Sequence, residues 1–530
     1  MMKNKNVLLI GFQDQGNLGI GYLTATLREH GYDVCVIDFR QDHRAILNVT
    51  QSVKPVLIGF SLIFQYYSPQ FAKLASYLRS HDVVCHFCIG GHYPSLCHED
   101  VLRMIPDIES VVRFEGESTL LELVDRLSNC QEWHDIPGIA YRRNGNIVTN
   151  PLRPLITDLD ILHHPWRSSK PEQVLGRIMM PILASRGCVR GCSFCSIRQF
   201  YTQPPGKVRR TRTPVNVVSE MRTLHEQNGA SVFLFQDDDF FLLGKTGWQW
   251  AHDFIDELDR QGLVGRVIWK ISCRADEVKT DLFSSLRDAG LYVVYLGLES
   301  GNEEGLRVLN KRISVEQNLQ AVSILKDLDI MFVFGFMLFD PSSTFDTVRY
   351  NIVFLRQIVG DGSSAVTFCK MLPYAGTDIE KELAKEGRLR GSVAQPDYSF
   401  LDPRLESYYN YVSQMASSWI DGPDALSPQF SSALHEIEVI RHLFPPVQGL
   451  DEYKSRLRSM VRESNDVLLS AVEQTCAIFE LGTRPQVSRS ELDNSCEKLS
   501  IDLINSRNTF IQSNQEVLLK ALAGEHMVRT

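Results

Sequence analysis

The sequence has neither an excess of positive charge nor a long run of apolar residues. Its formal net charge is −9 at pH 7 over 530 residues, so it has no basic field that would attract nucleic acid, and we expect no such partner. The longest apolar run, Ile330 to Phe339, is far shorter than the roughly 18–20 residues of a membrane span and predicts a buried strand. We therefore expect a globular protein without a membrane span.

The amino-terminal residues also lack the features of a secretory signal. MMKNKNVLLIGF passes from a few polar residues directly into a short strand pattern, whereas a signal has a longer apolar core and a small-residue cleavage site. We expect a cytoplasmic protein, in which thiols stay reduced and the twelve cysteines need not form disulfides. A chain of this length predicts two or three domains.

Residues 5 to about 130 alternate short apolar runs with amphipathic helical patterns. The strand patterns are NVLLIGF (6–12), YDVCVIDF (32–39), PVLIGFSL (55–62), VVCHFCIGG (83–91) and SVVRF (110–114). Buried strands that alternate with helices predict a parallel, doubly wound α/β sheet of the Rossmann-like kind, with ligands at the carboxyl ends of the strands. No G-x-G-x-x-G opens the first helix, which argues against a dinucleotide.

A linker follows, in which the pair Asn144-Gly145 predicts a hairpin turn. A second alternating series begins after it. Its six strand patterns are at 178–185, 231–237, 266–273, 291–298, 330–338 and 365–372. Six strand–helix units predict a partial, open (β/α)6 barrel of the TIM type, with its active site at the carboxyl ends of the strands. The pattern after about residue 390 is mainly helical. We thus expect an α/β domain at 1–135, a linker at 136–177, a barrel at 178–390 and a helical extension at 391–530.

The strongest chemical signal is the segment SRGCVRGCSFCSIRQFY (185–201), which spaces Cys188, Cys192 and Cys195 as C-x-x-x-C-x-x-C. Thiolates suit iron–sulfur clusters or zinc. A structural zinc site is normally closed by four protein ligands, and no fourth Cys or His is near. The triplet therefore favours a cluster with one iron left open, with a zinc site completed by a remote ligand, or a coincidence of buried cysteines, as the alternatives. Cys85 and Cys88 fall on opposite faces of a strand pattern and are interpreted as structural.

CVRGCSFC resembles the signature of the radical S-adenosylmethionine (SAM) superfamily, in which three cysteines hold a [4Fe–4S] cluster and the fourth iron chelates SAM. The resemblance implies that Phe194 lies beside the adenine and that electron transfer from the cluster cleaves SAM to a 5′-deoxyadenosyl radical. It also implies an external one-electron reductant of the flavodoxin or ferredoxin type. An enclosed barrel suits this chemistry because the radical must meet substrate before solvent.

Polar segments follow the next three barrel strands, as in that superfamily: FQDDDF (235–240), SCRADE (272–277) and GLESGNEEGLRVLNKR (297–312). The resemblance implies that the SAM-binding residues are Asp237, Asp238, Arg274, Glu299 and Ser300. The acidic run is equally consistent with a helix amino-terminal cap. LPYAGTD (372–378) resembles the P-x-x-G-T turn of the anaerobic magnesium-protoporphyrin cyclase-like branch, and a simple strand-to-helix turn is equally consistent with these residues.

Residues 5 to 130 resemble the cobalamin-binding domain that precedes the barrel in class B radical SAM methyltransferase-like proteins. Typical cobalamin domains carry D-x-H-x-x-G after the first strand, whereas this chain has glycine at the histidine position of Asp14-Gln15-Gly16-Asn17-Leu18-Gly19, so imidazole ligation of cobalt from there is impossible. The resemblance implies cobalamin contacts at Gln15, Gly16, Leu18, Gly19, Ser61, Leu62, Gly90, Gly91, Glu115 and Gly116. Phe114 stands where relatives usually have the first glycine of G-E-G-E. A nucleotide-binding domain and a domain that has lost its cofactor are the alternatives.

Together the two resemblances imply a cobalamin-dependent methyltransferase that places a methyl group on an unactivated carbon, or less often phosphorus, of a small-molecule or natural-product substrate. One SAM would methylate cob(I)alamin, and a second would supply the radical that activates the substrate. The alternative is a cobalamin radical SAM oxidative cyclase or rearrangement enzyme that transfers no methyl group. A non-catalytic cobalamin sensor is a remote alternative, because all three cluster cysteines are present.

Overall fold

The computed structural model describes residues 4–13, 16–168, 170–241, 244–483 and 489–528. The chain forms two compact units, and each is described by itself. The first comprises Met1–Pro171, Leu183–Asn216 and Leu372–Tyr398; the second comprises Glu172–Ile182, Val217–Met371 and Ser399–Thr530. These packing units divide the chain differently from the four predicted ranges, because the cysteine segment and 372–398 belong to the first unit. The four ranges therefore stay predictions.

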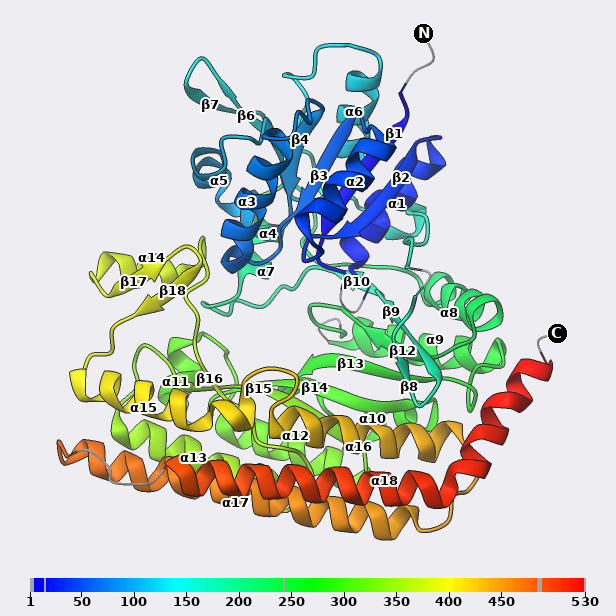
Figure 1. Cartoon of the computed structure of the whole chain (residues 1–530). Helices are drawn as coiled ribbons and strands as arrows, with labels where there is room; N and C mark the ends of the chain where they lie inside the picture. Colours follow the sequence, from blue (N-terminus) through cyan, green and yellow to red (C-terminus); the bar gives the residue numbers. More distant parts are fainter. Residues whose placement is uncertain (1–3, 14–15, 169, 242–243, 484–488, 529–530) are drawn as a thin grey trace. The chain divides into compact units, whose positions relative to one another are not determined.

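The first unit is built on a seven-stranded sheet in the order β2-β1-β3-β4-β5-β6-β7 (Figure 1). Its parallel strands are β1 (Asn6–Gly11), β2 (Asp33–Asp38), β3 (Leu57–Ser61), β4 (His86–Gly90) and β5 (Ser110–Val112). The helices between them are α1 (Leu18–Glu29), α2 (His43–Val53), α3 (Ser68–Arg79), α4 (His92–Leu96), α5 (His98–Met104) and α6 (Glu117–Ser128). The predicted doubly wound sheet is confirmed, and its strand order reverses between β1 and β3, where such sheets bind ligands.

Both faces of this sheet are buried. Along β1, Val7 and Leu9 belong to one hydrophobic core, whereas Leu8 and Ile10 belong to another on the opposite face. A strand covered on both faces needs apolar residues at every position, which explains the uninterrupted apolar run in NVLLIG. The hydrophobic effect on both faces thus holds the sheet between its two helix layers.

The Asn144-Gly145 pair forms the predicted hairpin between β6 (Ile139–Arg143) and β7 (Asn146–Thr149). Both residues have positive φ, 52° and 80°, as a type I′ turn requires. The hairpin extends the first sheet, because β6 pairs antiparallel with β5.

Besides η2 (Leu159–Ile161), the first unit contains elements from two later segments of the chain. They are β10 (Ser185–Arg186), α7 (Ser196–Thr202), β11 (Arg210–Thr211), α14 (Asp378–Lys385), β17 (Leu389–Ser392) and β18 (Gln395–Tyr398). The side chain of Gln65 donates to the Val393 carbonyl (2.9 Å) and accepts from the Ala375 amide (2.7 Å). Residues 372–398 are therefore tied to the first sheet although they follow the last barrel strand.

The second unit contains a seven-stranded sheet in the order β16-β15-β14-β13-β12-β9-β8. Its strands are β8 (Gln173–Val174), β9 (Arg177–Ile182), β12 (Ala230–Phe235), β13 (Ile268–Arg274), β14 (Leu291–Glu299), β15 (Met331–Phe339) and β16 (Cys369–Lys370). Six of them run parallel and β8 is antiparallel. The predicted partial barrel is confirmed as an open half-barrel, although β16 is much shorter than the predicted strand.

One face of this sheet is covered by helices that connect its strands. They are α8 (Pro214–Asn228), α9 (Lys245–Arg260), η3 (Ala275–Glu277), α10 (Thr280–Asp288), α11 (Glu303–Val308), α12 (Val315–Asp327) and α13 (Phe345–Val359). Burial alternates along β13, β14 and β15, so that the opposite face stays partly exposed. We call this the open face; its residues are Lys270, Ser272, Tyr295, Gly297, Glu299, Met331, Val333, Gly335 and Met337.

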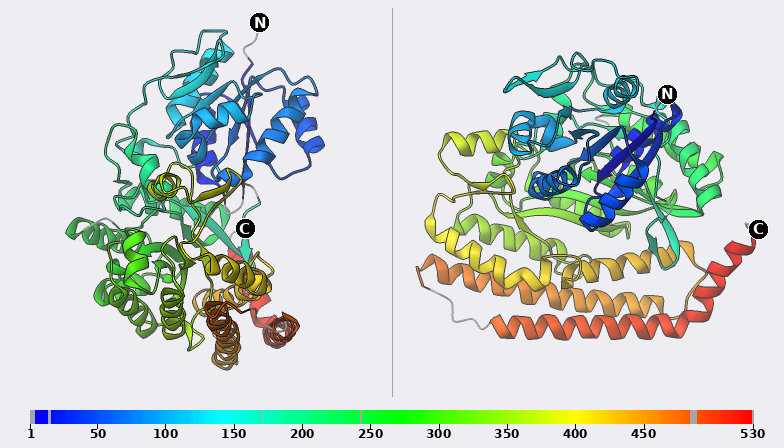
Figure 2. Two further views of the ribbon diagram at one scale, coloured as in Figure 1. Left: turned by 90° about the vertical axis from the view of Figure 1, so that its left-hand side faces the viewer. Right: turned by 45° about the horizontal axis from the view of Figure 1, so that its top comes forward.

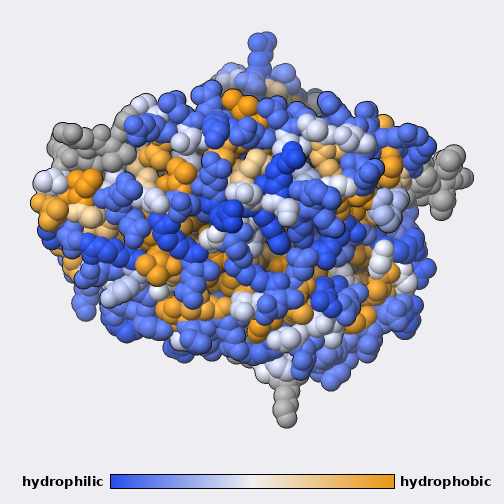
Figure 3. Space-filling view, turned by 90° about the horizontal axis from the view of Figure 1, so that it is seen from below, coloured by the Kyte–Doolittle hydropathy of each residue, from blue (hydrophilic) through white to orange (hydrophobic). Residues whose placement is uncertain are grey.

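The carboxyl-terminal helices are part of the second unit. They are α15 (Pro403–Ile420), α16 (Leu426–Leu443), α17 (Leu450–Glu480) and α18 (Arg489–Val528), and α17 and α18 lie side by side (Figures 1 and 2). Asn465 of α17 donates to the carbonyls of Val359 and Ser364 and accepts from the Val366 amide, at 2.8–2.9 Å. Seen from below in Figure 3, hydrophobic and hydrophilic residues are interspersed on the surface. Over the described ranges, no helix is both long and apolar enough to cross a membrane.

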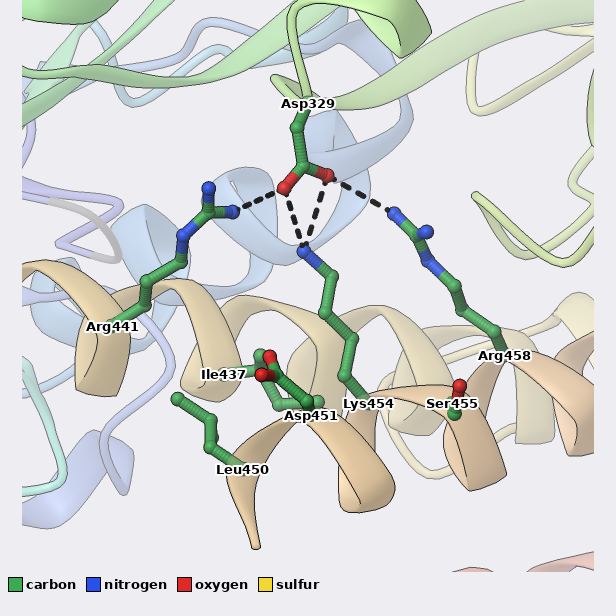
Figure 4. A pocket seen from close by; sticks show the side chains of 8 residues that line it. All are labelled: Asp329, Ile437, Arg441, Leu450, Asp451, Lys454, Ser455 and Arg458. Carbon is green, nitrogen blue, oxygen red and sulfur yellow. Dashed lines mark hydrogen bonds and ion pairs between the residues drawn. The ribbon is translucent and has the colours of Figure 1, made fainter. Parts of the chain in front are cut away.

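Asp329 joins the barrel to α16 and α17 (Figure 4). It follows α12 in the left-handed conformation, with φ of 50°, and its carboxylate accepts from Arg441 (2.5 Å), Lys454 (3.2 Å) and Arg458 (3.4 Å). Partial burial opposes ionisation, but the charges of Lys454 and Arg441 lower the pKa of Asp329 below its ordinary value. The cluster lines a cavity of about 340 Å³.

Candidate cofactor site

The three candidate cluster ligands lie in an irregular segment between β10 and α7. Cys188, Cys192 and Cys195 are all partly buried, and the Cys195 amide donates to the Cys192 carbonyl at 3.3 Å. Within the described ranges, no three His, Cys, Asp or Glu side chains are gathered as a ready-made metal site. The donor set of three thiols on one irregular loop still fits an iron–sulfur cluster with one open iron.

The start of this loop is held by close backbone packing. Gly187 has φ of +83°, and a Cβ atom there would lie 2.1 Å from the Val208 carbonyl oxygen. Arg209 donates to the Gly187 carbonyl at 2.9 Å. Only glycine fits such a position, which accounts for the glycine directly before the first cysteine.

A buried ion cluster, formed by Glu115, Glu117, Arg186 and Arg210, lies beside the same loop. Glu115 accepts from Arg210 (2.8 and 3.0 Å) and from Arg186 (3.2 Å), and Glu117 accepts from Arg186 (2.6 Å). The exposed fractions of the four side chains are only 1–9%. Burial opposes the charge of Arg186, yet Glu117 and Glu115 raise its pKa above the ordinary value. The cluster thus joins β10 and β11, which flank the cysteines, to the segment after β5.

Glu115 is one of the predicted cobalamin contacts. In the structure its carboxylate accepts from two arginines and from the Ile156 amide (2.8 Å). The pairing joins residues 71 and 95 positions apart. No local pattern shows such a pairing, and sequence reasoning missed it.

Phe114 packs directly on the helix that follows the cysteines. It has φ of 63°, a conformation that glycine adopts more easily, and its amide donates to Ser95 Oγ at 2.7 Å. Its ring lies 5.2 Å from Phe200 of α7, within a small core that also contains Leu155 and Tyr201. At this position the chain thus has a ring that packs against α7, the helix that follows the cysteine loop.

The candidate cobalamin residues lie at the carboxyl edge of the first sheet. Ser61 pairs with Gly11 and with Gly90, so the ends of β1, β3 and β4 meet there. Gly91 has φ of +111°, and a Cβ atom there would lie 2.4 Å from the Leu62 carbonyl oxygen. Close packing against Leu62 therefore requires glycine at position 91, and the edge itself is where doubly wound sheets bind ligands.

The other predicted cobalamin residues have varied surroundings. Gly16 has φ of +62°, and Leu18 and Leu62 are buried, which gives both leucines a packing role. Gly19 lies in the first turn of α1, and Gly116 precedes α6. Asp14 and Gln15 lie outside the described residues.

Among the predicted SAM residues, Arg274 has the geometry of an anion-binding group. It is buried at the end of β13, with Nε 2.9 Å from Asp276 and Nη2 2.7 Å from the Lys311 carbonyl. Its Nη1 is buried without a hydrogen-bond partner among the described residues. A carboxylate is the group that would satisfy such a donor.

Glu299 ends β14 beside that arginine. It has φ of 65°, and its carboxylate accepts from Lys311 Nζ at 3.0 Å. Lys311 thereby connects Glu299 with Arg274 through its side chain and its carbonyl. Sequence reasoning did not single out Lys311, although it lies in the segment 297–312.

The remaining predicted SAM residues are distributed unevenly. Asp237 is buried and Asp238 is exposed. Ser300 is completely buried, and its hydroxyl donates to Asn351 at 3.2 Å and accepts from Asn302 at 3.0 Å, which favours a role in the turn. Phe194 is partly buried in the cysteine segment of the first unit.

Two family models match the chain. The model of the B12 binding domain matches residues 11–124, and that of the radical SAM superfamily matches residues 182–351. The chain joins a B12 binding domain to a radical SAM domain. The radical SAM domain implies SAM and a [4Fe–4S] cluster, and the B12 binding domain implies cobalamin.

Two curated relatives and one solved structure are similar over most of the chain. An uncharacterized methyltransferase of Pyrococcus horikoshii is 28% identical over 399 residues, which are 73% of this chain and 83% of the relative. The anaerobic magnesium-protoporphyrin IX monomethyl ester cyclase of Rubrivivax gelatinosus is 28% identical over 381 residues, 69% of this chain and 65% of the relative. The cobalamin-dependent SAM radical enzyme OxsB has the same fold, with a TM-score of 0.66 and 16% identity over 98% of this chain and 83% of that one.

Proposed function

We propose that this radical SAM enzyme is a cobalamin-dependent methyltransferase that methylates an unactivated carbon, or less often phosphorus, of a small molecule. The observation that carries the proposal is the presence of both cofactor domains in one chain, with the segment after β5 ion-paired to the base of the cysteine loop. The similarity to a methyltransferase over 83% of that relative supports it. The similarity to a cyclase keeps cyclisation or rearrangement as the alternative.

The chain's own residues would bind and position the reacting groups. Cys188, Cys192 and Cys195 would hold three irons, and Arg274 Nη1 would bind the SAM carboxylate. When bound, the cluster and SAM supply a carbon radical and cobalamin supplies the methyl group. No side chain is required as a nucleophile, so the protein contributes orientation and exclusion of water.

The finer features of this function follow from the same chemistry. The cluster needs electrons one at a time, so we infer an external reductant of the flavodoxin or ferredoxin type. Reduced thiols and an oxygen-sensitive cluster fit a cytoplasmic location. The formal charge of −9 argues against a nucleic-acid substrate.

A test without substrate separates the proposal from its alternative. The full chain is reconstituted anaerobically with iron, sulfide and cobalamin, then given SAM under strong reduction, and S-adenosylhomocysteine and 5′-deoxyadenosine are measured by mass spectrometry. Methyl transfer predicts S-adenosylhomocysteine whose formation depends on cobalamin. Formation of 5′-deoxyadenosine alone, with or without cobalamin, would favour cyclisation or rearrangement.

A further inference from the structure

The open face of the half-barrel is arranged in rows that the strand register defines. Lys270 is paired with Val293, which is paired with Met331. The next row contains Ser272, Tyr295 and Val333. Gly297 and Gly335 pair in the third row, toward the carboxyl ends of the strands. The first row thus contains a charged residue, the second an aromatic residue and the third two glycines.

Lys270 is the charged residue of the first row, and it has no acidic partner. Its Nζ lies 5.8 Å from the centroid of the Tyr295 ring, and it forms no ion pair or hydrogen bond with the described residues. Burial lowers its pKa, with no opposing contribution from a carboxylate. The other two lysines near the strand ends are paired, Lys311 with Glu299 (3.0 Å) and Lys370 with Glu406 (3.9 Å).

The helix that packs against the sheet near Lys270 supplies no free acid either. His435 of α16 accepts from the Tyr292 hydroxyl at 2.6 Å when its Nε2 is unprotonated, and burial, with the charge of Lys270, lowers its pKa to about 4. The acidic residues of α16 are already engaged: Glu438 with Lys454 (3.0 Å) and Glu436 with Arg507 (2.6 Å). His435 is therefore neutral near pH 7, and the positive charge of Lys270 stays uncompensated.

An unpaired, partly buried ammonium group is energetically unfavourable unless an anionic ligand compensates its charge. Several apolar side chains of the face can contact an apolar body: Tyr295 is 39% exposed, Val333 is paired with it, and Met331, Val333 and Met337 are partly exposed. The third row consists of glycines covered by neighbouring polar atoms: a Cβ atom at Gly335 would lie 2.5 Å from the Tyr295 hydroxyl, and one at Gly297 would lie 2.7 Å from Lys311 Nζ. The face therefore has an uncompensated cation at Lys270, apolar side chains beyond it and the paired Lys311 and Glu299 toward the strand ends.

We propose that the open face binds the substrate and that Lys270 pairs with an anionic group, a carboxylate or phosphate, at one end of it. This inference rests on the proposed function, because it takes the carboxyl ends of the strands as the reacting end. Lys270 lies four residues before Arg274 on β13, a depth of about 13 Å at 3.3 Å per residue. The substrate is accordingly an elongated molecule with an apolar body and an anionic end remote from the reacting atom.

Four probes that share one alkyl chain test the proposal: octanoate, octyl phosphate, octan-1-ol and octylammonium. Each is titrated calorimetrically into the reconstituted full chain with SAM present, for the wild type, Lys270→Met and Lys270→Arg. A charge-assisted contact predicts that at least one anionic probe binds the wild type about tenfold more tightly than octan-1-ol. Lys270→Met should lose this preference and Lys270→Arg should keep it. Whether octanoate or octyl phosphate binds more tightly identifies the anionic group.

Equal binding of the anionic probes and octan-1-ol to the wild type would overturn the proposal. An unchanged preference in Lys270→Met would do the same. Thermal unfolding gives a second criterion: because the ammonium is uncompensated, Lys270→Met should unfold at the same or a higher temperature, and a lower one would indicate a structural role. The titration needs no turnover, so its failure is distinct from a failure of the S-adenosylhomocysteine assay.

Discussion

Buried charges are paired at the base of the cysteine loop, whereas the buried charge on the open face of the half-barrel has no partner among the described residues. In the buried ion cluster, Glu115 and Glu117 each accept from an arginine, and the four side chains are almost completely buried. On the open face, Lys270 lies 5.8 Å from the centroid of the Tyr295 ring and forms no ion pair with the described residues. A buried charge with an intramolecular partner holds two segments together, whereas a buried charge without one is tolerated where a ligand compensates it. The contrast separates the part of the molecule that holds the loop from the part that we assign to the substrate.

The largest expected effect is the loss of a cluster ligand. Cys192→Ala should lower both the iron content and the reductive cleavage of SAM, the latter by a factor of about 10³ or more, because the radical step depends on the cluster. The measurements are iron and sulfide analysis and 5′-deoxyadenosine formation. Cys130→Ala, at an exposed cysteine of the same unit, is the matched control and should match the wild type. Full iron and full SAM cleavage in Cys192→Ala would refute the assignment of the loop.

Breaking the buried ion cluster should cost stability. Glu115→Gln leaves Arg210 and Arg186 without one of their carboxylates, and removal of one partner of a buried pair costs about 3–5 kcal/mol. Urea unfolding of the first unit measures the change. The control is Glu99→Gln, which removes a partner of Arg103. The Glu99 side chain is 54% exposed and that of Arg103 is 62% exposed, so this substitution should change the unfolding free energy by less than about 1 kcal/mol. Equal effects of the two substitutions would remove the distinction between the two regions.

Phe114→Gly tests the packing beside the same loop. Loss of a buried phenylalanine ring costs about 3–5 kcal/mol, and relief of the positive φ returns about 1 kcal/mol, so a net loss of about 2–4 kcal/mol is expected. Phe64, whose side chain is 37% exposed, provides the control as Phe64→Ala. If Phe114→Gly were as stable as the wild type, the ring would not support the α7 helix.

The smallest expected effect concerns Asp329, whose charge is paired but partly exposed. Its pKa is lowered in the folded protein, so its contribution is present above the ordinary aspartate pKa of about 4 and is lost as the pH falls through the lower folded value. Asp329→Asn should therefore lower the unfolding temperature slightly at pH 7, by no more than about 1 kcal/mol in free energy. The difference from the wild type should shrink below pH 4. A constant difference down to pH 3 would contradict the ion-pair explanation.

Much of both sheets was predictable because buried parallel strands are apolar at almost every position. The runs that became β1, β3, β14 and β15 show this pattern plainly, and the turn at Asn144-Gly145 has a local conformational cause. The predicted end strand at 365–372 was too long, since only Cys369–Lys370 pair with β15. The strand β16 is short because of its tertiary surroundings, and no residue of the local sequence indicates where it ends.

The candidate site residues also divide into those that the local sequence indicates and those that only distant segments determine. The spacing of the cysteines is a local feature, and so is the glycine before the first of them. The partners of Glu115 and the connection of Glu299 to Arg274 through Lys311 depend on distant or intervening segments. The environment of Lys270 depends on three neighbouring strands and α16.

The amino-acid sequence by itself determined the two alternating α/β series and the thiol triplet, because hydrophobic periodicity and ligand spacing act over a few residues. Only the tertiary structure decided that residues 372–398 return to the first unit, that Glu115 pairs with the flanks of the cysteine loop, and that Lys270 is left without an acid. The reason is physical: whether a buried charge is compensated depends on groups far away in the chain, and folding alone brings them together.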